Sequence, residues 1–468
     1  MLKACTLMLL LSYVHTSIAF DQSQWITALY KTNRTILFKD LTYPGAHDAI
    51  TADLSTDIPY YEDIGSLLRV WPIRQLSSIV AGSVIRSFSQ TQLINITSML
   101  NGGIRLLDLR ATIKDRIYDE HCLDGEWRGY HGVVTNKPFR EYIKEVSSWI
   151  HLPQYRSEIV LVMISYHGDN ECVSNCWNSI PSVCVQRLFS DTVEILGRDI
   201  LFNQTSHNIS TVNIGDLVDS GQRIILLWSG TDSLTQTHDR DFAVDQASAT
   251  CQDSCNPTLN TGSLKNISDK VISLDTSFRR IAKHVSNNKL SIMGLENSIL
   301  PCIAKVGAVR AIDRNYCNGA KHSNIINTGW CLSCENCFNM PSNLQGCPWV
   351  TMTSNAAIVN YYTQRSLDNV VRYPDHYRFP SILYQDMLDF NGRVIVDPYQ
   401  YNISTPYVET IVLYNFLRHS PKHALTRVLR EKYYNSSPIR NLPSSPRDGI
   451  YPQNGPNSWP ISNKCSVG

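Results

Sequence analysis

Several short segments of this 468-residue chain carry uninterrupted runs of apolar residues between turn-forming residues. They are "TILFKDLTYPG" (35–45), "GGIRLLDLRA" (102–111), "SEIVLVMISYHG" (157–168), "GQRIILLWSG" (221–230) and "PSILYQDML" (380–388). A continuous apolar run, as opposed to an alternating one, is typical of a parallel strand that is buried on both faces. The pattern therefore predicts five buried parallel strands.

Helical patterns lie between these strands. Residues 138–153 ("PFREYIKEVSSWIHLP") and 181–198 ("PSVCVQRLFSDTVEILGR") repeat apolar positions every three or four residues. Strands that alternate with helices indicate an α/β fold with a parallel sheet. A (β/α)8 TIM-type barrel, regular or distorted, fits the chain length better than a small doubly wound sheet, although the pattern alone does not decide between them.

Residues 300–350 interrupt this pattern. They show little apolar periodicity, and five cysteines fall between Cys317 and Cys347. We interpret the region as a disulfide-rich loop insertion in the barrel. Zinc binding is the alternative for Cys331, Cys334, Cys337 and Cys347. From about Ser436 the chain is rich in Pro, Ser and Asn, which predicts an irregular tail over 436–468.

The N-terminal segment 1–19 has the pattern of a signal peptide. Lys3 precedes a short apolar run, and Ser17-Ile18-Ala19 resembles a cleavage site. Later in the chain we find no run long enough for a transmembrane helix, so the barrel is expected over 20–435 without a transmembrane anchor.

Two further features agree with a secreted or secretory-pathway protein. Thirteen of the 14 cysteines follow the leader, which in an oxidising compartment favours disulfides and leaves an odd thiol. Seven Asn-x-Ser/Thr acceptors predict a glycoprotein; they begin at Asn33, Asn95, Asn203, Asn208, Asn266, Asn402 and Asn435. The formal charge of only +1 gives no basic excess for nucleic-acid binding.

Ionisable side chains cluster at the ends of the predicted strands. His47 and Asp48 follow the Pro-Gly turn at residues 44–45, and Asp108 and Arg110 lie on one side of the second strand. His131 follows in "RGYHGVV". Two histidines, an arginine and carboxylates suit general acid–base cleavage of a phosphodiester. Each part has a structural alternative: a solvated surface turn, an ion pair between Asp108 and Arg110, and a loop histidine.

The motifs taken in order resemble a known family. "PGAHDAI", "SFSQTQLINITSMLNGGIRLLDLR", "YHG" and "PSILYQDML" are similar to the catalytic X-region of phosphatidylinositol-specific phospholipase C, especially the secreted bacterial enzymes and related X-domain proteins. The resemblance is good over about residues 25–170 and thin elsewhere. In that family the His-Asp turn, the "GIRxxDxR" segment and the "HG" segment end the first three barrel strands.

The resemblance implies a role for six residues. His47 would be the general base on the inositol 2-hydroxyl, and His131 the general acid for the glycerol oxygen. Arg110 would bind the phosphate, with Asp48 and Asp108 as the surrounding carboxylates. Asp386 is the match for the aspartate that orients the base.

The same resemblance implies a phosphodiesterase that acts on phosphatidylinositol or a glycosyl-phosphatidylinositol lipid at a membrane surface, through a cyclic inositol phosphate. Arg110 stands where calcium-dependent relatives place ligands, so we expect no cofactor and no metal. In the head-group pocket this sequence offers Ser165, His167 and Trp228 where bacterial relatives have basic residues. The alternatives are a metal-dependent glycerophosphodiesterase or sphingomyelinase D-like barrel, and an inactive barrel that binds lipid or protein.

Overall fold

The computed structural model describes residues 20–57, 59, 86, 89–115, 122, 126–166, 180–234, 237–251, 277–279, 289–295, 364, 366–386, 394–396, 399–401 and 407–436. The leader at 1–19, the Cys-rich region at 300–350 and the tail after Ser436 lie outside these residues. The predictions for those three regions therefore stay predictions.

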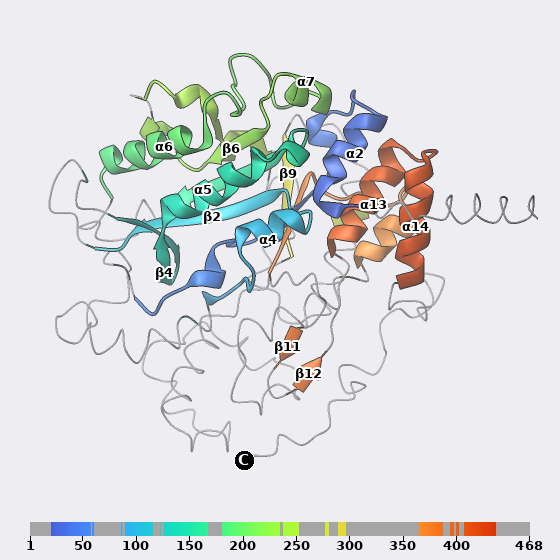
Figure 1. Ribbon diagram of the computed structural model, residues 1–468, viewed down its shortest axis with the longest axis horizontal. Helices are drawn as coiled ribbons and strands as arrows, with labels where there is room; N and C mark the ends of the chain where they lie inside the picture. Colours follow the sequence, from blue (N-terminus) through green and yellow to red (C-terminus); the bar gives the residue numbers. More distant parts are fainter. Residues whose placement is uncertain are drawn as a thin grey trace, which may run out of the picture.

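The core of the fold is a curled parallel sheet (Figure 1). Eight strands within the described residues follow one another in the order β7-β6-β5-β2-β1-β10-β9-β8, and each neighbouring pair is parallel. The strands are β1 (Tyr43–Ala46), β2 (Leu106–Ile113), β5 (Val160–Tyr166), β6 (Ile224–Trp228), β7 (Ala243–Asp245), β8 (Thr250–Cys251), β9 (Leu290–Gly294) and β10 (Ile382–Gln385).

The two end strands of this sheet, β7 and β8, are connected through the chain and not through backbone pairing. The four-residue helix α8 (Gln246–Ala249) connects β7 to β8, and no pairing links these two strands in the described part of the chain. The architecture is thus an α/β fold of the predicted class, a distorted TIM-type barrel that is open between β7 and β8.

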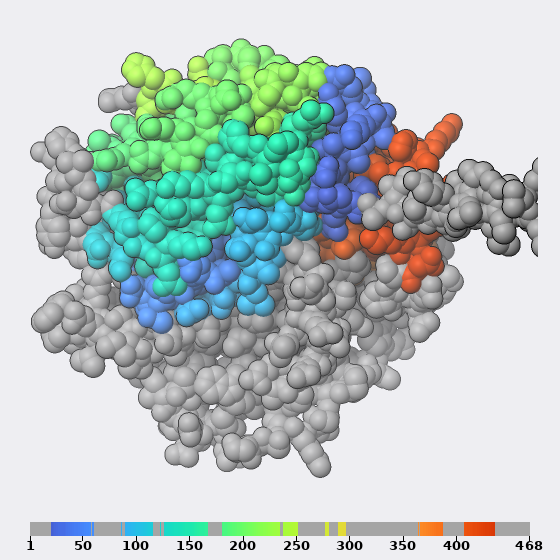
Figure 2. All heavy atoms as spheres, in the orientation of Figure 1, coloured from blue at the N-terminus to red at the C-terminus, as the bar shows by residue number. Residues whose placement is uncertain are grey.

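Helices cover the outer face of the sheet (Figures 1 and 2). In α5 (Phe139–Ile150) the buried residues Phe139, Tyr142, Ile143, Val146, Trp149 and Ile150 repeat at helical spacing. α6 (Ser182–Leu196) begins after Pro181 and buries a similar stripe. The other helices are α2 (Trp25–Thr32), α4 (Ile96–Asn101), α7 (Ile214–Asp219), α13 (Tyr407–His419) and α14 (Ala424–Ser436). Each buried large apolar side chain contributes roughly 1.5–3 kcal/mol to folding.

Four of the five predicted strands are present with shifts of a few residues at their ends, as are both predicted helices. The first strand is much shorter than predicted. Only Tyr43–Ala46 pair with their neighbours, and Phe38–Asp40 form a turn of 3-10 helix. The apolar residues Ile36, Phe38 and Leu41 of this segment are buried under the barrel as a packed loop, which explains their pattern without a strand.

A hairpin extends from β2 beyond the parallel sheet. β3 (Trp127–His131) pairs antiparallel with the end of β2, and β4 (Val133–Pro138) returns along β3. A second small ladder joins β11 (Val394–Val396) and β12 (Tyr399–Tyr401). One disulfide, Cys122–Cys184, links the segment before β3 to α6. Among the described helices, none has both the length and the apolar character needed to cross a bilayer.

Candidate active site

The first site element is the turn that follows β1. The strand is fixed by β10 on one side and β2 on the other. Beyond it, the N–H of His47 donates to the carbonyl of Gln385 (3.2 Å) and the N–H of Ala49 donates to the carbonyl of Asp108 (2.8 Å). Asp48 takes a left-handed backbone conformation (φ 45°), which aspartate tolerates better than most residues. The turn directs both the His47 and the Asp48 side chains to the same place.

His47 is oriented by two groups from β10 and its end. The ring donates from Nδ1 to Oδ1 of Asp386 at 2.7 Å. Its face stacks on Tyr384, with ring centroids 5.5 Å apart. Tyr384 and Asp386 are two residues apart, so their side chains leave the strand on the same side. This pairing fixes the tautomer and leaves Nε2 to face the rest of the site.

Arg110 lies across the open side of His47. Its Nε is 2.6 Å from Oδ1 of Asp48, and one terminal nitrogen is 3.5 Å from Oδ2 of Asp108. The same nitrogen is 2.9 Å from Nε2 of His47. The side chain is 34% exposed, in contrast to the buried carboxylates, so part of the guanidinium can reach a ligand that enters from solvent.

His131 approaches from the hairpin. Gly132, with φ 74°, makes the tight turn between β3 and β4, a conformation that favours glycine. At the end of β3, Nε2 of His131 lies 3.3 Å from Oδ2 of Asp48, and Nδ1 donates to the carbonyl of Ser89 at 2.5 Å. The two imidazole centroids are 6.3 Å apart. Oδ2 of Asp48 is therefore close to Nε2 of both histidines, 3.4 Å from that of His47.

The carboxylates set the protonation of the site. Burial alone lowers the pKa of His47, but Asp48 and Asp386 outweigh it and raise the pKa to about 10. Burial raises the pKa of Asp48, but the charges of Arg110 and the two histidines reverse this and leave the pKa below its usual value. Burial keeps the pKa of Asp108 above its usual value.

Two protonation states of His47 fit this geometry. An arginine N–H can only donate, so its 2.9 Å contact with Nε2 fits an unprotonated ring nitrogen. When Nε2 carries a proton, Oδ2 of Asp48 at 3.4 Å is the acceptor within reach. Arg110 and Asp48 thus compete for the same ring edge, and a ligand that engages Arg110 changes the balance.

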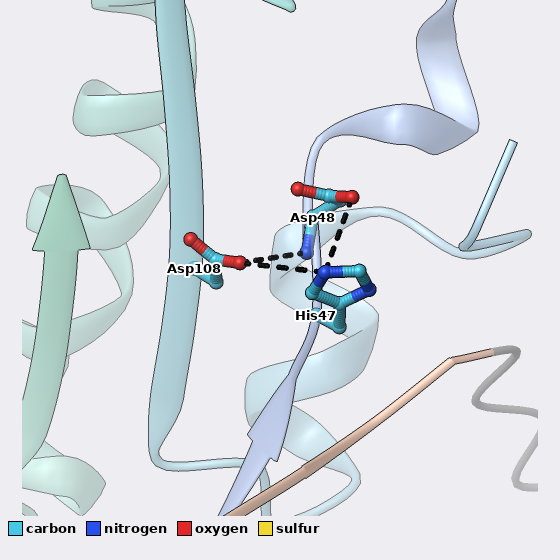
Figure 3. Close-up of side chains that lie close together, drawn as sticks. All are labelled: His47, Asp48 and Asp108. Carbon is cyan, nitrogen blue, oxygen red and sulfur yellow. Dashed lines mark hydrogen bonds and ion pairs between the residues drawn. The ribbon is translucent and has the colours of Figure 1, made fainter. Parts of the chain in front are cut away.

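His47, Asp48 and Asp108 also bring three ligand-type atoms within 4.8 Å of one another (Figure 3). Figure 3 shows the Nε2 edge of His47 turned toward both carboxylates. A divalent cation fits this set poorly, because the guanidinium of Arg110 already contacts all three residues. The positive charge at this position belongs to the chain itself.

The six residues predicted from the sequence lie together in this site. His131 differs from the expectation in one respect: its strand is antiparallel and belongs to a hairpin, not to the parallel barrel. Trp228 does not join the site. It is fully buried and packs edge to face on Phe189 of α6, on the outer side of the sheet. His167 lies outside the described residues.

Sequence reasoning missed three contributors to the site. Tyr384 stacks on His47, Ser89 accepts from His131, and Gln92 contacts the backbone that carries His47. For Tyr384 a signal was available, because it stands two residues before Asp386 on the same strand. Ser89 acts through its backbone carbonyl, and Gln92 lies in a loop with no periodicity, so the sequence offered no physical signal for either.

Comparisons with known proteins point to one group. No family model matches the chain. Human PI-PLC X domain-containing protein 1 is 23% identical over 218 residues, which is 46% of this chain and 59% of that protein. Zebrafish (Danio rerio) PI-PLC X domain-containing protein 3 is 27% identical over 144 residues, 30% of this chain and 40% of the relative. The matched region thus spans less than two thirds of these relatives.

Solved structures of bacterial enzymes are also similar to this chain. Phosphatidylinositol-specific phospholipase C from Listeria monocytogenes has 14% sequence identity and a TM-score of 0.49, with 84% of this chain and 99% of that chain covered. A Staphylococcus aureus phosphatidylinositol-specific phospholipase C has 12% identity and a TM-score of 0.45.

Proposed function

We propose that this chain, which is similar to PI-PLC X domain-containing proteins, cleaves a phosphodiester of phosphatidylinositol or of a glycosyl-phosphatidylinositol lipid. The observation that carries the proposal is the position of Asp48, whose Oδ2 lies 3.4 and 3.3 Å from Nε2 of the two histidines, while Arg110 contacts Oδ1 of the same carboxylate. A base, an acid and a phosphate-binding cation are thereby held around one carboxylate.

The proposed reaction is an intramolecular transfer. Nε2 of His47 takes the proton of the inositol 2-hydroxyl, and that oxygen forms a new bond to phosphorus. Arg110 donates to the phosphoryl oxygens, whose negative charge grows in the transition state. The bond from phosphorus to the glycerol oxygen breaks, and His131 gives that oxygen a proton. The products are a diacylglycerol and a cyclic inositol phosphate.

The electrostatics of the free site suit this sequence of steps. Arg110 contacts Nε2 of His47 at 2.9 Å and the buried Asp48 at 2.6 Å. A phosphate that draws the partly exposed guanidinium toward itself uncovers Nε2 for the hydroxyl. Nε2 of His131, 3.3 Å from Oδ2 of Asp48, is the second imidazole nitrogen of the site and is placed to protonate the leaving oxygen. Arg110 supplies the charge that calcium supplies in metal-dependent enzymes.

The test is incubation with phosphatidylinositol vesicles in EDTA, with phosphorus NMR of the water-soluble product. We expect a cyclic inositol phosphate before the open monophosphate, at a rate that added calcium does not raise. A first product that carries solvent oxygen-18 would indicate direct attack by water and the metal-dependent alternative. Absence of turnover on both phosphatidylinositol and a glycosyl-phosphatidylinositol lipid would favour the inactive binding barrel.

The assignment of acid and base has its own test. His131→Ala should recover part of its lost activity on an inositol phosphodiester with a nitrophenol leaving group, because such a group leaves without protonation. His47→Ala should stay inactive on the same substrate, because the 2-hydroxyl still needs a base. Equal recovery of the two variants would reverse or remove the assignment.

We further propose that the protein folds in the secretory pathway and is secreted as a glycoprotein. The Cys122–Cys184 disulfide supports an oxidising compartment. The acceptor residues Asn95 and Asn208 are exposed, as glycosylation requires. Expression with the native N-terminus in a eukaryotic host should give a secreted product whose mobility shifts after glycosidase treatment. Retention of an unglycosylated chain in the cytosol would refute this.

A further inference from the structure

The segment 89–92 contacts both histidines of the proposed site. Ser89 accepts from Nδ1 of His131 at 2.5 Å. The side chain of Thr91 donates to the carbonyl of His47 at 3.3 Å. Gln92, which is fully buried, donates from its side-chain amide to two carbonyls, those of His47 and Gln385, both at 2.9 Å. An amide NH2 has two donors, so this group bridges the two strands' ends.

Gln92 makes these two bonds where the ladder between β1 and β10 ends. The ladder between β1 and β10 ends at the pair Ala46 and Gln385. His47 and Asp386 are the next residues on each strand, and neither belongs to a pair of the ladder. The 3.2 Å bond from the His47 N–H to Gln385 is the last backbone link between them. Gln92 adds a second link at the same point.

Gln92 is itself held in place. Its N–H donates to the hydroxyl of Thr51 at 2.9 Å, and that hydroxyl donates to the carbonyl of Asp48, also at 2.9 Å. Gln92 is thus linked to the turn that carries Asp48 as well as to the backbone of His47. It is fixed at three points, two through its side-chain amide and one through its backbone N–H, and this restrains the backbone segments that it joins.

We infer that Gln92 is a positioning residue that keeps the His47 ring paired with Asp386 by holding the backbones of β1 and β10 together beyond the end of their ladder. The inference deepens the proposed function, on which it rests for the role of His47 as a base. Gln92 touches no reacting atom in this scheme. Its effect on catalysis passes through the position of His47.

The test compares Gln92→Met with a matched control. Methionine keeps the size and removes both donors. In the control, Asn415→Leu removes a second buried amide, whose side chain bonds the N–H (2.9 Å) and the carbonyl (2.7 Å) of Thr42 at the other end of β1. Each variant loses two side-chain hydrogen bonds to the backbone, but only those of Gln92 lie at the site, one to His47 and one to Gln385 of β10.

The readout is NMR of selectively labelled histidine, which needs no substrate. In the free protein the paired Nδ1 proton of His47 should give a resolved resonance, and the ring should titrate with a pKa raised to about 10. In Gln92→Met we expect that resonance to weaken and the titration to move down by one unit or more. Asn415→Leu should leave both unchanged. Unchanged titration in Gln92→Met, or an equal shift in Asn415→Leu, would overturn the inference.

Kinetics on phosphatidylinositol vesicles give the second readout. Small displacements of a reacting group cost on the order of a hundredfold in rate, so kcat of Gln92→Met should fall about 10- to 100-fold with KM little changed. If Gln92→Met does not fold, Gln92→Glu replaces it. Burial raises the pKa of the new carboxyl, and its neutral form keeps one donor, so an intermediate loss is expected. An inactive wild type, together with the expected downward shift of the His47 titration in Gln92→Met, would refute the proposed function and leave the positioning role standing.

Discussion

Arg110 contacts both His47, the proposed base, and the neighbouring carboxylates, so at the residue scale its shape matters as much as its charge. Nε faces Asp48 while a terminal nitrogen reaches His47 and Asp108, a spread that only the planar fork of a guanidinium covers. A lysine ammonium is a single point of charge. It can neutralise Asp48, but it cannot hold a phosphoryl group by two parallel bonds at the same time.

Arg110→Lys should therefore lose most activity although the charge is kept. Loss of one transition-state hydrogen bond costs about 2.7–4 kcal/mol, or a hundredfold to a thousandfold in kcat. The measurement is kcat on phosphatidylinositol vesicles, with the thermal midpoint as a control for folding. Lys114, the residue after β2, forms an ion pair with Asp57. The variant Lys114→Arg is the matched control, and its kcat should be near that of the wild type. Near-normal turnover of Arg110→Lys would place the residue outside the chemistry.

The pH dependence of activity also belongs to the residue scale. A histidine in water titrates near ~6.5, but Asp48 and Asp386 raise the pKa of His47 to about 10. As the proposed base, His47 can act only when Nε2 is unprotonated, so the limb of the pH profile that belongs to His47 should lie on the alkaline side. Because the two carboxylates raise this pKa, removal of one of them should shift the limb to lower pH.

In Asp386→Asn the His47 titration should fall by about 1–3 units, the usual effect of one adjacent opposite charge. The corresponding limb of the kcat/KM profile should move to lower pH by the same amount. The maximum rate should fall as well, because a less basic and less fixed ring accepts a proton less readily. Coincident profiles for wild type and variant would show that Asp386 does not act on the base.

At the scale of elements, the sequence predicted the long strands, whose apolar runs follow from burial. It missed the short strands and the hairpin, which depend on pairing with neighbouring strands. The runs at 102–111, 157–168, 221–230 and 380–388 all contain parallel strands, because a strand covered on both faces must be apolar throughout. Strands β7, β8 and β9 are two to five residues long and left no comparable signal. The β3–β4 hairpin is interrupted by Gly129 and Gly132, which hid the strand that carries His131.

The candidate site was predictable for a related reason. His47 and Asp386 directly follow the buried strands β1 and β10, and the carboxyl ends of parallel strands meet at one edge. Asp108 lies within β2, next to the point where the shorter β1 ends. Register was not predictable. It depends on close contacts such as that of Gly45, where the backbones of β1, β2 and β10 pack together.

Gly45→Ala tests that contact. A Cβ at this position would lie 2.8 Å from Cβ of Tyr384 and 2.8 Å from a methyl group of Leu106. Tyr384 stacks on His47, so the displacement should reach the site as well as the core. We expect a loss of about 1–3 kcal/mol in the free energy of unfolding, typical of an overpacked core, together with reduced activity. Urea denaturation measures the first. The exposed Ser98→Ala should change stability by less than about 0.5 kcal/mol.

At the scale of the whole molecule, the disulfide connects the site hairpin to the outer helical layer. Cys122 precedes β3, and Cys184 lies in α6 over the sheet, 62 residues along the chain. The chain segment between them includes His131, the hairpin, α5 and β5. The cross-link thus closes a loop around much of the barrel's first half and restrains the approach of the hairpin to Asp48.

Cys122→Ala/Cys184→Ala should therefore destabilise the fold and affect the site selectively. In the chain-entropy treatment a closed loop of this length contributes on the order of 4 kcal/mol to stability. Denaturant titration should show that loss, and the variant should lose activity at a temperature where the His47–Asp386 pair still gives its NMR resonance, because His131 alone depends on the hairpin. Dithiothreitol should act on the wild type in the same direction. If the NMR resonances of His47 and His131 changed together in the variant, the disulfide would stabilise the barrel as a unit, and the hairpin would not be a separately restrained element.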